Sequence, residues 1–117
     1  MAESPKQLGA IVATAATTGA DASGQLLYTV PGSTAAIVST IFVCNQGGSS
    51  ATFKIAHVQN GGVSSINKKY YTHNGAPISG NDTIAITTGI AMAANDSLVV
   101  YASSTDVNFV ATGIEIT

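Results

Sequence analysis

The run Thr34-Ala35-Ala36-Ile37-Val38-Ser39-Thr40-Ile41-Phe42-Val43-Cys44-Asn45 is the most strand-like stretch of this 117-residue chain. Ile37, Ile41 and Val43 are β-branched, and apolar residues occupy both alternating sets of positions. A strand that is apolar on both faces is typical of the centre of a sheet that is covered on both sides. We therefore expect residues 34–45 to form a central strand of a β-fold.

The rest of the chain repeats this pattern in shorter form, because short apolar runs alternate with clusters of Gly, Pro, Asn, Asp and Ser. Such spacing is typical of strands and turns, and no stretch shows a convincing helical period. Further strands are expected at residues 8–14, 25–30, 51–58, 70–72 and 107–117, and after the Asn-Asp turns at 81–82 and 95–96. About seven or eight strands with short connections predict an all-β fold, an antiparallel β-sandwich of jelly-roll or immunoglobulin-like type.

The domain organisation follows from the length, because domains most often contain roughly 100–150 residues. We expect a single domain, with an N-terminal arm or edge strand at residues 1–24 and the β-sandwich proper at residues 25–117. The arm is a candidate for pairing with a neighbouring molecule by strand addition. Residues 34–45 and 51–58 are separated only by a polar loop and are expected to pair as a hairpin.

The composition excludes several classes of partner. Charged residues make up 9% of the chain, against about 25% in a typical domain, while 45% of the residues are hydrophobic. The net charge of −2 is unlike the basic stripe that nucleic-acid binding requires, and Lys68-Lys69-Tyr70-Tyr71 is more typical of a solvated loop than of a basic aromatic patch. No stretch approaches the roughly 20 apolar residues of a membrane span, and the first residues lack the pattern of a secretory signal. We expect a soluble protein with neither a nucleic-acid nor a membrane partner.

Candidate chemistry is sparse. The residues that could carry it are His57, His73, Cys44, Glu3, Asp21, Asp82, Asp96, Asp106 and Glu115. They show neither a triad order nor a metal-ligand spacing, so we expect no enzyme, no catalytic, cofactor-binding or metal-binding residues, and no cofactor. Because it shares a strand face with Phe53 and Ile55, His57 is expected to be a structural histidine that faces the core or an interface. His73 is expected in a solvent-facing loop, and Cys44 as a buried apolar side chain.

The two Asn-Asp segments allow alternative interpretations. Asn81-Asp82-Thr83 and Asn95-Asp96-Ser97 match the glycosylation acceptor pattern, and Asp82 and Asp96 could hold calcium together with turn carbonyls. Turn chemistry explains both segments better, because Asn and Asp side chains bond the nearby backbone and tolerate left-handed dihedral angles.

Five segments carry a resemblance to a known group of proteins. They are Leu27-Tyr28-Thr29-Val30-Pro31-Gly32-Ser33-Thr34, Ile37-Val38-Ser39-Thr40-Ile41-Phe42-Val43-Cys44-Asn45, Asp82-Thr83-Ile84, Ala93-Ala94-Asn95-Asp96-Ser97-Leu98-Val99-Val100 and Ala111-Thr112-Gly113-Ile114-Glu115-Ile116. In this order they resemble small β-sandwich virion structural proteins of tailed bacteriophages, such as those of marine cyanophages, over residues 25–117. The matching residues are turn and core positions, so no functional site carries over.

The resemblance implies assembly rather than catalysis. The expected function is capsid decoration or cementing, in which the protein binds the lattice of the major capsid protein on the virion and stabilises the head. A homotrimer is the expected form, since capsids offer local threefold positions. One alternative is a tail, neck or fibre component. A second is a carbohydrate-binding module, for which Tyr28, Tyr70, Tyr71 and Tyr101 are the only candidate tyrosines and Trp is absent.

Overall fold

Eight β-strands build the molecule. The computed structural model describes residues 3–13, 25–61 and 70–117, and these residues contain no α-helix. The strands are β1 (Glu3–Val12), β2 (Gln25–Thr29), β3 (Ala35–Asn45), β4 (Ala51–Val58), β5 (Tyr71–Ile78), β6 (Thr83–Met92), β7 (Ser97–Ala102) and β8 (Val107–Ile116). They confirm the predicted all-β class.

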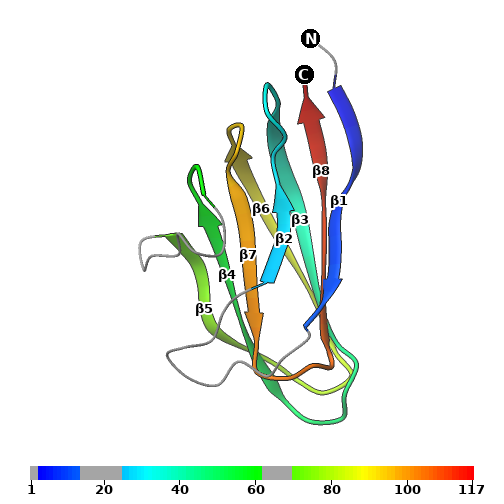
Figure 1. Ribbon diagram of the computed structural model, residues 1–117. Helices are drawn as coiled ribbons and strands as arrows, with labels where there is room; N and C mark the ends of the chain where they lie inside the picture. Colours follow the sequence, from blue (N-terminus) through cyan, green and yellow to red (C-terminus); the bar gives the residue numbers. More distant parts are fainter. Residues whose placement is uncertain (1–2, 14–24, 62–69) are drawn as a thin grey trace.

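The strands form two four-stranded antiparallel sheets that face each other (Figure 1). Sheet A has the order β1-β8-β3-β6, and sheet B has the order β2-β7-β4-β5. The first strand thus pairs with the last, the second with the seventh, the third with the sixth, and the fourth with the fifth. This is the strand order of a jelly roll, which distinguishes it from the immunoglobulin-like alternative.

The expected hairpin between residues 34–45 and 51–58 is wrong. β3 lies in sheet A between β8 and β6, whereas β4 lies in sheet B between β7 and β5. The polar loop at residues 46–50 carries the chain from one sheet to the other, and the amide of Gln46 donates to the carbonyl of Asp106. The partners of β3 are β6 and β8, and those of β4 are β5 and β7, so the short loop between β3 and β4 does not make them a pair.

β1 is an edge strand of sheet A. It begins at Glu3, earlier than the Leu8 start expected from the sequence, because β8 is long enough to offer Ile116 as a partner opposite Glu3. Residues 14–24 lie outside the described residues, so only part of the expected arm is described. Its β1 portion pairs with β8 of the same chain, and pairing with a neighbouring molecule stays a prediction.

The hydrophobic core fills the space between the two sheets. Phe53 from sheet B and Phe109 from sheet A meet edge to face, with ring centroids 6.3 Å apart. The other large, fully buried side chains between the sheets are aliphatic: Ile41, Ile55, Ile78, Leu98, Val30, Val38, Val43 and Val100. Phe53 and Ile55 alternate with Lys54 along β4, as the sequence predicts for a strand with one face in the core.

β3 is central in sheet A, as predicted, but only one of its faces is covered by the described residues. Val38, Ile41 and Val43 are fully buried against sheet B. On the opposite face Ile37 is 42% exposed and Phe42 is 38% exposed. The expectation of a strand covered on both sides is therefore wrong within the described chain, and an apolar surface remains open.

Candidate interaction surface

The open surface lies on the side of sheet A that faces away from sheet B, and we call it the outer face of sheet A. It is formed by Ala35, Ile37, Ser39, Thr40, Phe42 and Cys44 of β3, by Thr83, Ala85, Thr87 and Ala91 of β6, and by Asn108, Val110, Thr112, Ile114 and Ile116 of β8. None of these side chains is charged. Cys44, expected to be buried, is only half-buried here.

The register of the strands arranges this face into two apolar rows. Ile37 lies opposite Ile114 on one side and Ala91 on the other. Phe42 lies between Val110 and Ala85 in the same way. β-branched and aromatic neighbours across strands pack well together, so each row presents a continuous apolar ridge.

A band of hydroxyl groups separates the two rows. Thr112 lies opposite Thr40, and its hydroxyl donates to the Thr40 carbonyl at 3.4 Å. The register of β3 shifts between Val38 and Thr40 toward both neighbours, and that of β1 shifts close to the same level. Bulges of this kind bend a strand, which here leaves a shallow hollow of about 360 Å³ bordered by Pro5, Lys6, Ser39, Thr112, Gly113 and Ile114.

The nearest charged residues lie along β1 and β8 at the border of this face, where the exposed Glu3 is opposite Ile116 and Lys6 forms an ion pair with Glu115. Lys6 reaches inward from β1 to Glu115, with Nζ 2.5 Å from Oε1, and the Tyr28 hydroxyl of sheet B donates to Oε2. The hydrogen bonds from Lys6 and Tyr28 hold the pKa of Glu115 below its ordinary value, although burial opposes them. Burial and then the bond to Glu115 raise the pKa of Tyr28. This cluster joins the two sheets near the chain ends.

The outer side of sheet B is different, because most of its apolar side chains are buried within the chain. Ala56, Val58 and Val99 have no exposed surface, and Tyr101 is nearly buried. Lys54 lies over the Tyr101 ring, 5.7 Å from its centroid. Burial, followed by the hydrogen bond with Tyr101, raises the pKa of Tyr71 to about 12. Among the described residues, sheet B exposes a large apolar side chain only at Leu26 of its edge strand β2, whereas sheet A exposes Ile37 and Phe42 on its central strand.

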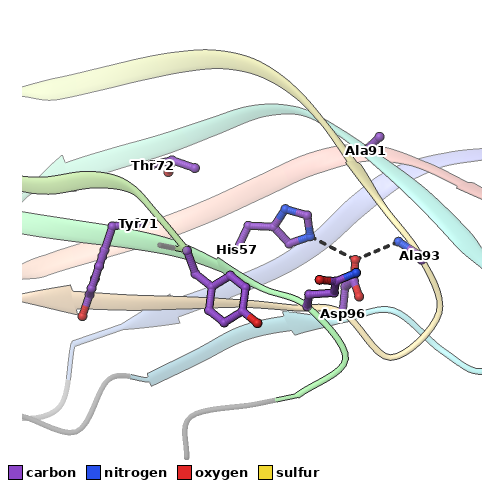
Figure 2. Close-up of a pocket in the computed structure, with 8 residues that line it drawn as sticks. His57, Tyr71, Thr72, Ala91, Ala93 and Asp96 are labelled. Carbon is purple, nitrogen blue, oxygen red and sulfur yellow. Dashed lines mark hydrogen bonds and ion pairs between the residues drawn. The ribbon is translucent and has the colours of Figure 1, made fainter. Parts of the chain in front are cut away.

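A second hollow lies beside His57, with a volume of about 440 Å³. Among the described residues it is lined by His57, Gln59, Tyr70, Tyr71, Thr72, Ala91, Ala93 and Asp96. Figure 2 shows His57 and the backbone of Ala93 converging on the carboxylate of Asp96. His57 Nε2 lies 3.0 Å from Asp96 Oδ2.

Asp96 holds two loops together rather than presenting a free carboxylate. Its Oδ1 accepts from the amide of Asn60, and its Oδ2 accepts from the amide of Ala93. Burial alone would raise the pKa of Asp96, but the bonds from Asn60, His57 and Ala93 outweigh it and lower the pKa. His57 faces inward in register with Phe53 and Ile55 and is hydrogen-bonded, which is the arrangement expected for a structural histidine.

His73 does not lie in a solvent-facing loop, so that expectation is wrong. It is part of β5, and its ring stacks on Phe53 with centroids 6.2 Å apart. The strand continues through Gly75, which adopts a φ of 70° that few other residues tolerate. The sequence suggests a turn at Gly75, but in the structure this glycine allows β5 to continue with an irregular backbone.

The Asn-Asp segments act as turns, as the sequence predicts. Asn81 and Asn95 adopt φ values of 56° and 71°, and Asp82 accepts a hydrogen bond from the amide of Thr83. Asp82 precedes β6 and Asp96 follows it, so a ten-residue strand of about 33 Å separates the two carboxylates. They cannot share one calcium ion, and no cluster of three or more metal-binding side chains occurs among the described residues.

The remaining candidate residues lie apart. Glu3 begins β1, and the exposed Asp106 accepts a hydrogen bond from Ser104. Asp21, Lys68 and Lys69 lie outside the described residues. Sequence reasoning missed the outer face of sheet A as a site, although the apolar residues on both faces of residues 34–45 were its signal.

Comparisons with protein-family models, with curated proteins and with solved structures give no match to this chain. In the described part of the chain, no helix is long and apolar enough to cross a membrane.

Proposed function

We propose that this protein is a structural protein of a tailed-bacteriophage virion that decorates or cements the capsid. In this role the outer face of sheet A docks on the lattice of the major capsid protein. The observation that carries the proposal is the uncharged, apolar character of this face, with Ile37 and Phe42 exposed at its centre. Large exposed apolar patches on proteins mark interaction sites.

The dimensions of this face fit such a contact. Together with the adjoining edge strand β1, the three strands of this face present roughly 600 Å² on one side, from about ten residues per strand, strand spacings of about 4.8 Å and rises of about 3.3 Å. Specific interfaces bury about 600 to 1,000 Å² on each partner. Contact with this face and the adjoining side of β1 therefore reaches the lower end of the range for a specific protein complex.

Fold-level analogy also supports a virion role, since jelly rolls are common in viral capsid domains. The resemblance to phage virion β-domains adds a homotrimer at a local threefold position of the capsid as the assembly form. A tail, neck or fibre component is the alternative location, because the same face would serve a contact there.

The carbohydrate-binding alternative rests on the hollow beside His57. Tyr28 and Tyr101 are buried, whereas Tyr70 and Tyr71 line this hollow together with Gln59 and Thr72. Aromatic rings combined with amide and hydroxyl groups suit a sugar ring. A glycan array probed with the purified protein tests this alternative, and an array without hits would remove it.

Copy number in purified virions tests the lead proposal. Quantitative mass spectrometry against the major capsid protein should give hundreds of copies per particle for a capsid protein. Copies in the tens or fewer would favour the tail or neck, and absence from the virion would overturn the proposal.

The docking face is tested with charge substitutions. Ile37→Lys places a charge at the centre of the outer face, and we expect it to abolish binding to undecorated capsids. Ser50→Lys adds the same charge in the exposed loop between β3 and β4 and should bind as the wild type does. Equal binding by the two variants would contradict docking through this face.

A further inference from the structure

The four edge strands of the two sheets differ in how they are protected from pairing with other chains. The edges are β1 and β6 in sheet A and β2 and β5 in sheet B. Edge strands expose unpaired backbone groups, and proteins commonly block them with Pro, charge, bulges or short length. A strand without these features is open to a further strand.

Three of the edges carry such protection. β1 contains Pro5 and Lys6 and has an irregular register. β2 has only five residues and also shifts register. β5 contains Pro77 and shifts register twice along its pairing with β4. Each is a poor template for an added strand.

β6 differs over its first half, Thr83-Ile84-Ala85-Ile86-Thr87. This segment has no charge, proline or glycine, and its register against β3 is regular. β3 is its strand neighbour on one side, and within residues 3–13, 25–61 and 70–117 sheet A ends at β6 on the other. The irregular part of β6 begins after Thr87, where Gly89 adopts a φ of 64°.

The sequence of this segment reads the same in both directions. An antiparallel pair of two such segments, centred on Ala85, places Ala85 opposite Ala85 of the second copy. Ile84 then lies opposite Ile86 of the second copy, and Thr83 opposite Thr87. Like residues therefore meet across the pair, with Thr-Thr contacts on the outer side and Ile-Ile contacts on the core side.

We propose that two copies of this chain associate edge to edge through Thr83–Thr87 of β6, about a twofold axis at Ala85. The pair joins two copies of sheet A into one eight-stranded antiparallel sheet. An isologous contact requires a self-complementary surface, which the symmetric segment provides. Each chain carries a net charge of −2, but none of that charge lies on this segment, so repulsion at the contact is weak.

The exposure of these side chains agrees with the pairing. Thr83, Ala85 and Thr87 are exposed, and Ile84 and Ile86 are half-buried against the core. The second copy would cover the isoleucines further. The outer faces of the two sheets would also become continuous, doubling the uncharged surface proposed for docking.

The mass of the purified protein in solution tests the proposal, measured by light scattering after size exclusion. The wild type should contain an even number of chains: two, or six if the twofold contact joins two of the proposed homotrimers. Ala85→Lys places two like charges opposite each other and should halve that mass, with an unchanged circular dichroism spectrum. Ala91→Lys is the matched control, because Ala91 is exposed on the same strand but lies beyond Gly89, and its mass should stay that of the wild type.

A thiol cross-link gives a second readout that does not depend on affinity. In a Cys44→Ser background, Ala85→Cys should form an intermolecular disulfide under mild oxidation, since opposed residues meet the Cα distance that a disulfide needs. Ala91→Cys should not, because the two Ala91 positions would lie about 40 Å apart at ~3.3 Å per residue. A monomeric wild type, a mass with an odd number of chains, or equal behaviour of the two lysine variants would overturn the twofold contact. Copy number in virions is measured separately, so this pairing and the virion role can fail independently.

Discussion

Glu115 shows how single residues connect the two sheets. Its carboxylate lies on β8 in sheet A and accepts hydrogen bonds from Lys6 of β1 and Tyr28 of sheet B. Glu115 is only 9% exposed, whereas half of the Lys6 side-chain surface remains in water. A buried carboxylate depends on its partners more than an exposed ammonium does.

We expect Tyr28→Phe to destabilise the protein more than Lys6→Ala. The first leaves a buried carboxylate with one fewer donor, at a cost of about 1–3 kcal/mol. The second removes a half-exposed ion pair, at a cost of about 0–1 kcal/mol. Urea denaturation of both variants at neutral pH measures the difference, and a larger loss for Lys6→Ala would contradict this account.

The same cluster predicts how stability depends on pH. The pKa of Glu115 is lowered in the folded state, so its contribution is fully present above the ordinary value of 4.5 and is lost as the pH falls through the folded pKa. The stability difference between the wild type and Tyr28→Phe should therefore shrink in acid. Asp96 also has a lowered pKa, but it is the same in both proteins and cancels in the difference.

β3 shows what an element contributes on each of its faces. Ile41 points into the core and has no exposed surface, while Ile37 is 42% exposed on the outer face of sheet A. The two residues have the same side chain on the same central strand. Ile41 therefore contributes to the stability of the fold, and Ile37 contributes to the exposed surface.

Truncating Ile41 should mainly reduce stability, and truncating Ile37 should mainly reduce binding. Ile41→Ala should cost about 2–5 kcal/mol of unfolding free energy, because it leaves a cavity in the core. Ile37→Ala should cost less than about 1 kcal/mol and instead weaken binding to capsids. Thermal unfolding and a capsid-binding assay on both variants check this, and comparable losses of stability would show that Ile37 is packed.

The strands themselves could largely be predicted from the sequence, while their partners could not. Alternation of apolar and polar residues marks β4 and β8, and it places His57 on the inner side. The pairing of β3 with β6 and β8, and the Asp96 partner of His57 39 residues away, depend on contacts between distant segments. Local patterns carry little information about such contacts.

The candidate surface shows the same division. The apolar residues on both faces of residues 34–45 are visible in the sequence, but only the sheet order shows which face sheet B covers. The symmetric run Thr83–Thr87 is also visible, yet it has no meaning until β6 is known to be an edge. The position of a strand in its sheet therefore decides which of its residues form an exposed surface.

At the scale of the whole molecule, three neighbouring strands of sheet A carry no charge on their outer side, and Glu3 of β1 is the charge that borders them. The outer face of sheet A has no charged side chain over β3, β6 and β8. Association through such a face depends on apolar burial, which salt does not screen.

Binding through this face should therefore be almost independent of ionic strength between about 0.05 M and about 0.5 M salt. If Ile37→Lys retains weak binding, that binding should become salt-dependent, because it introduces a charge at the contact. Capsid co-sedimentation over this salt range measures both. A steep loss of wild-type binding with salt would point to a charged surface elsewhere on the molecule.

The pairing of β1 with β8 sets Glu3 opposite Ile116, and Figure 1 shows the start of β1 and the end of β8 at the same end of the sandwich. The first and last strands are thus paired neighbours, and the distance from the end of β8 back to the start of β1 is short. A circular permutant, with a short linker from β8 to β1 and new ends in the exposed loop at residues 48–50, would keep every strand pair. The fold is then defined by which strands pair, and it does not depend on which strand comes first in the chain.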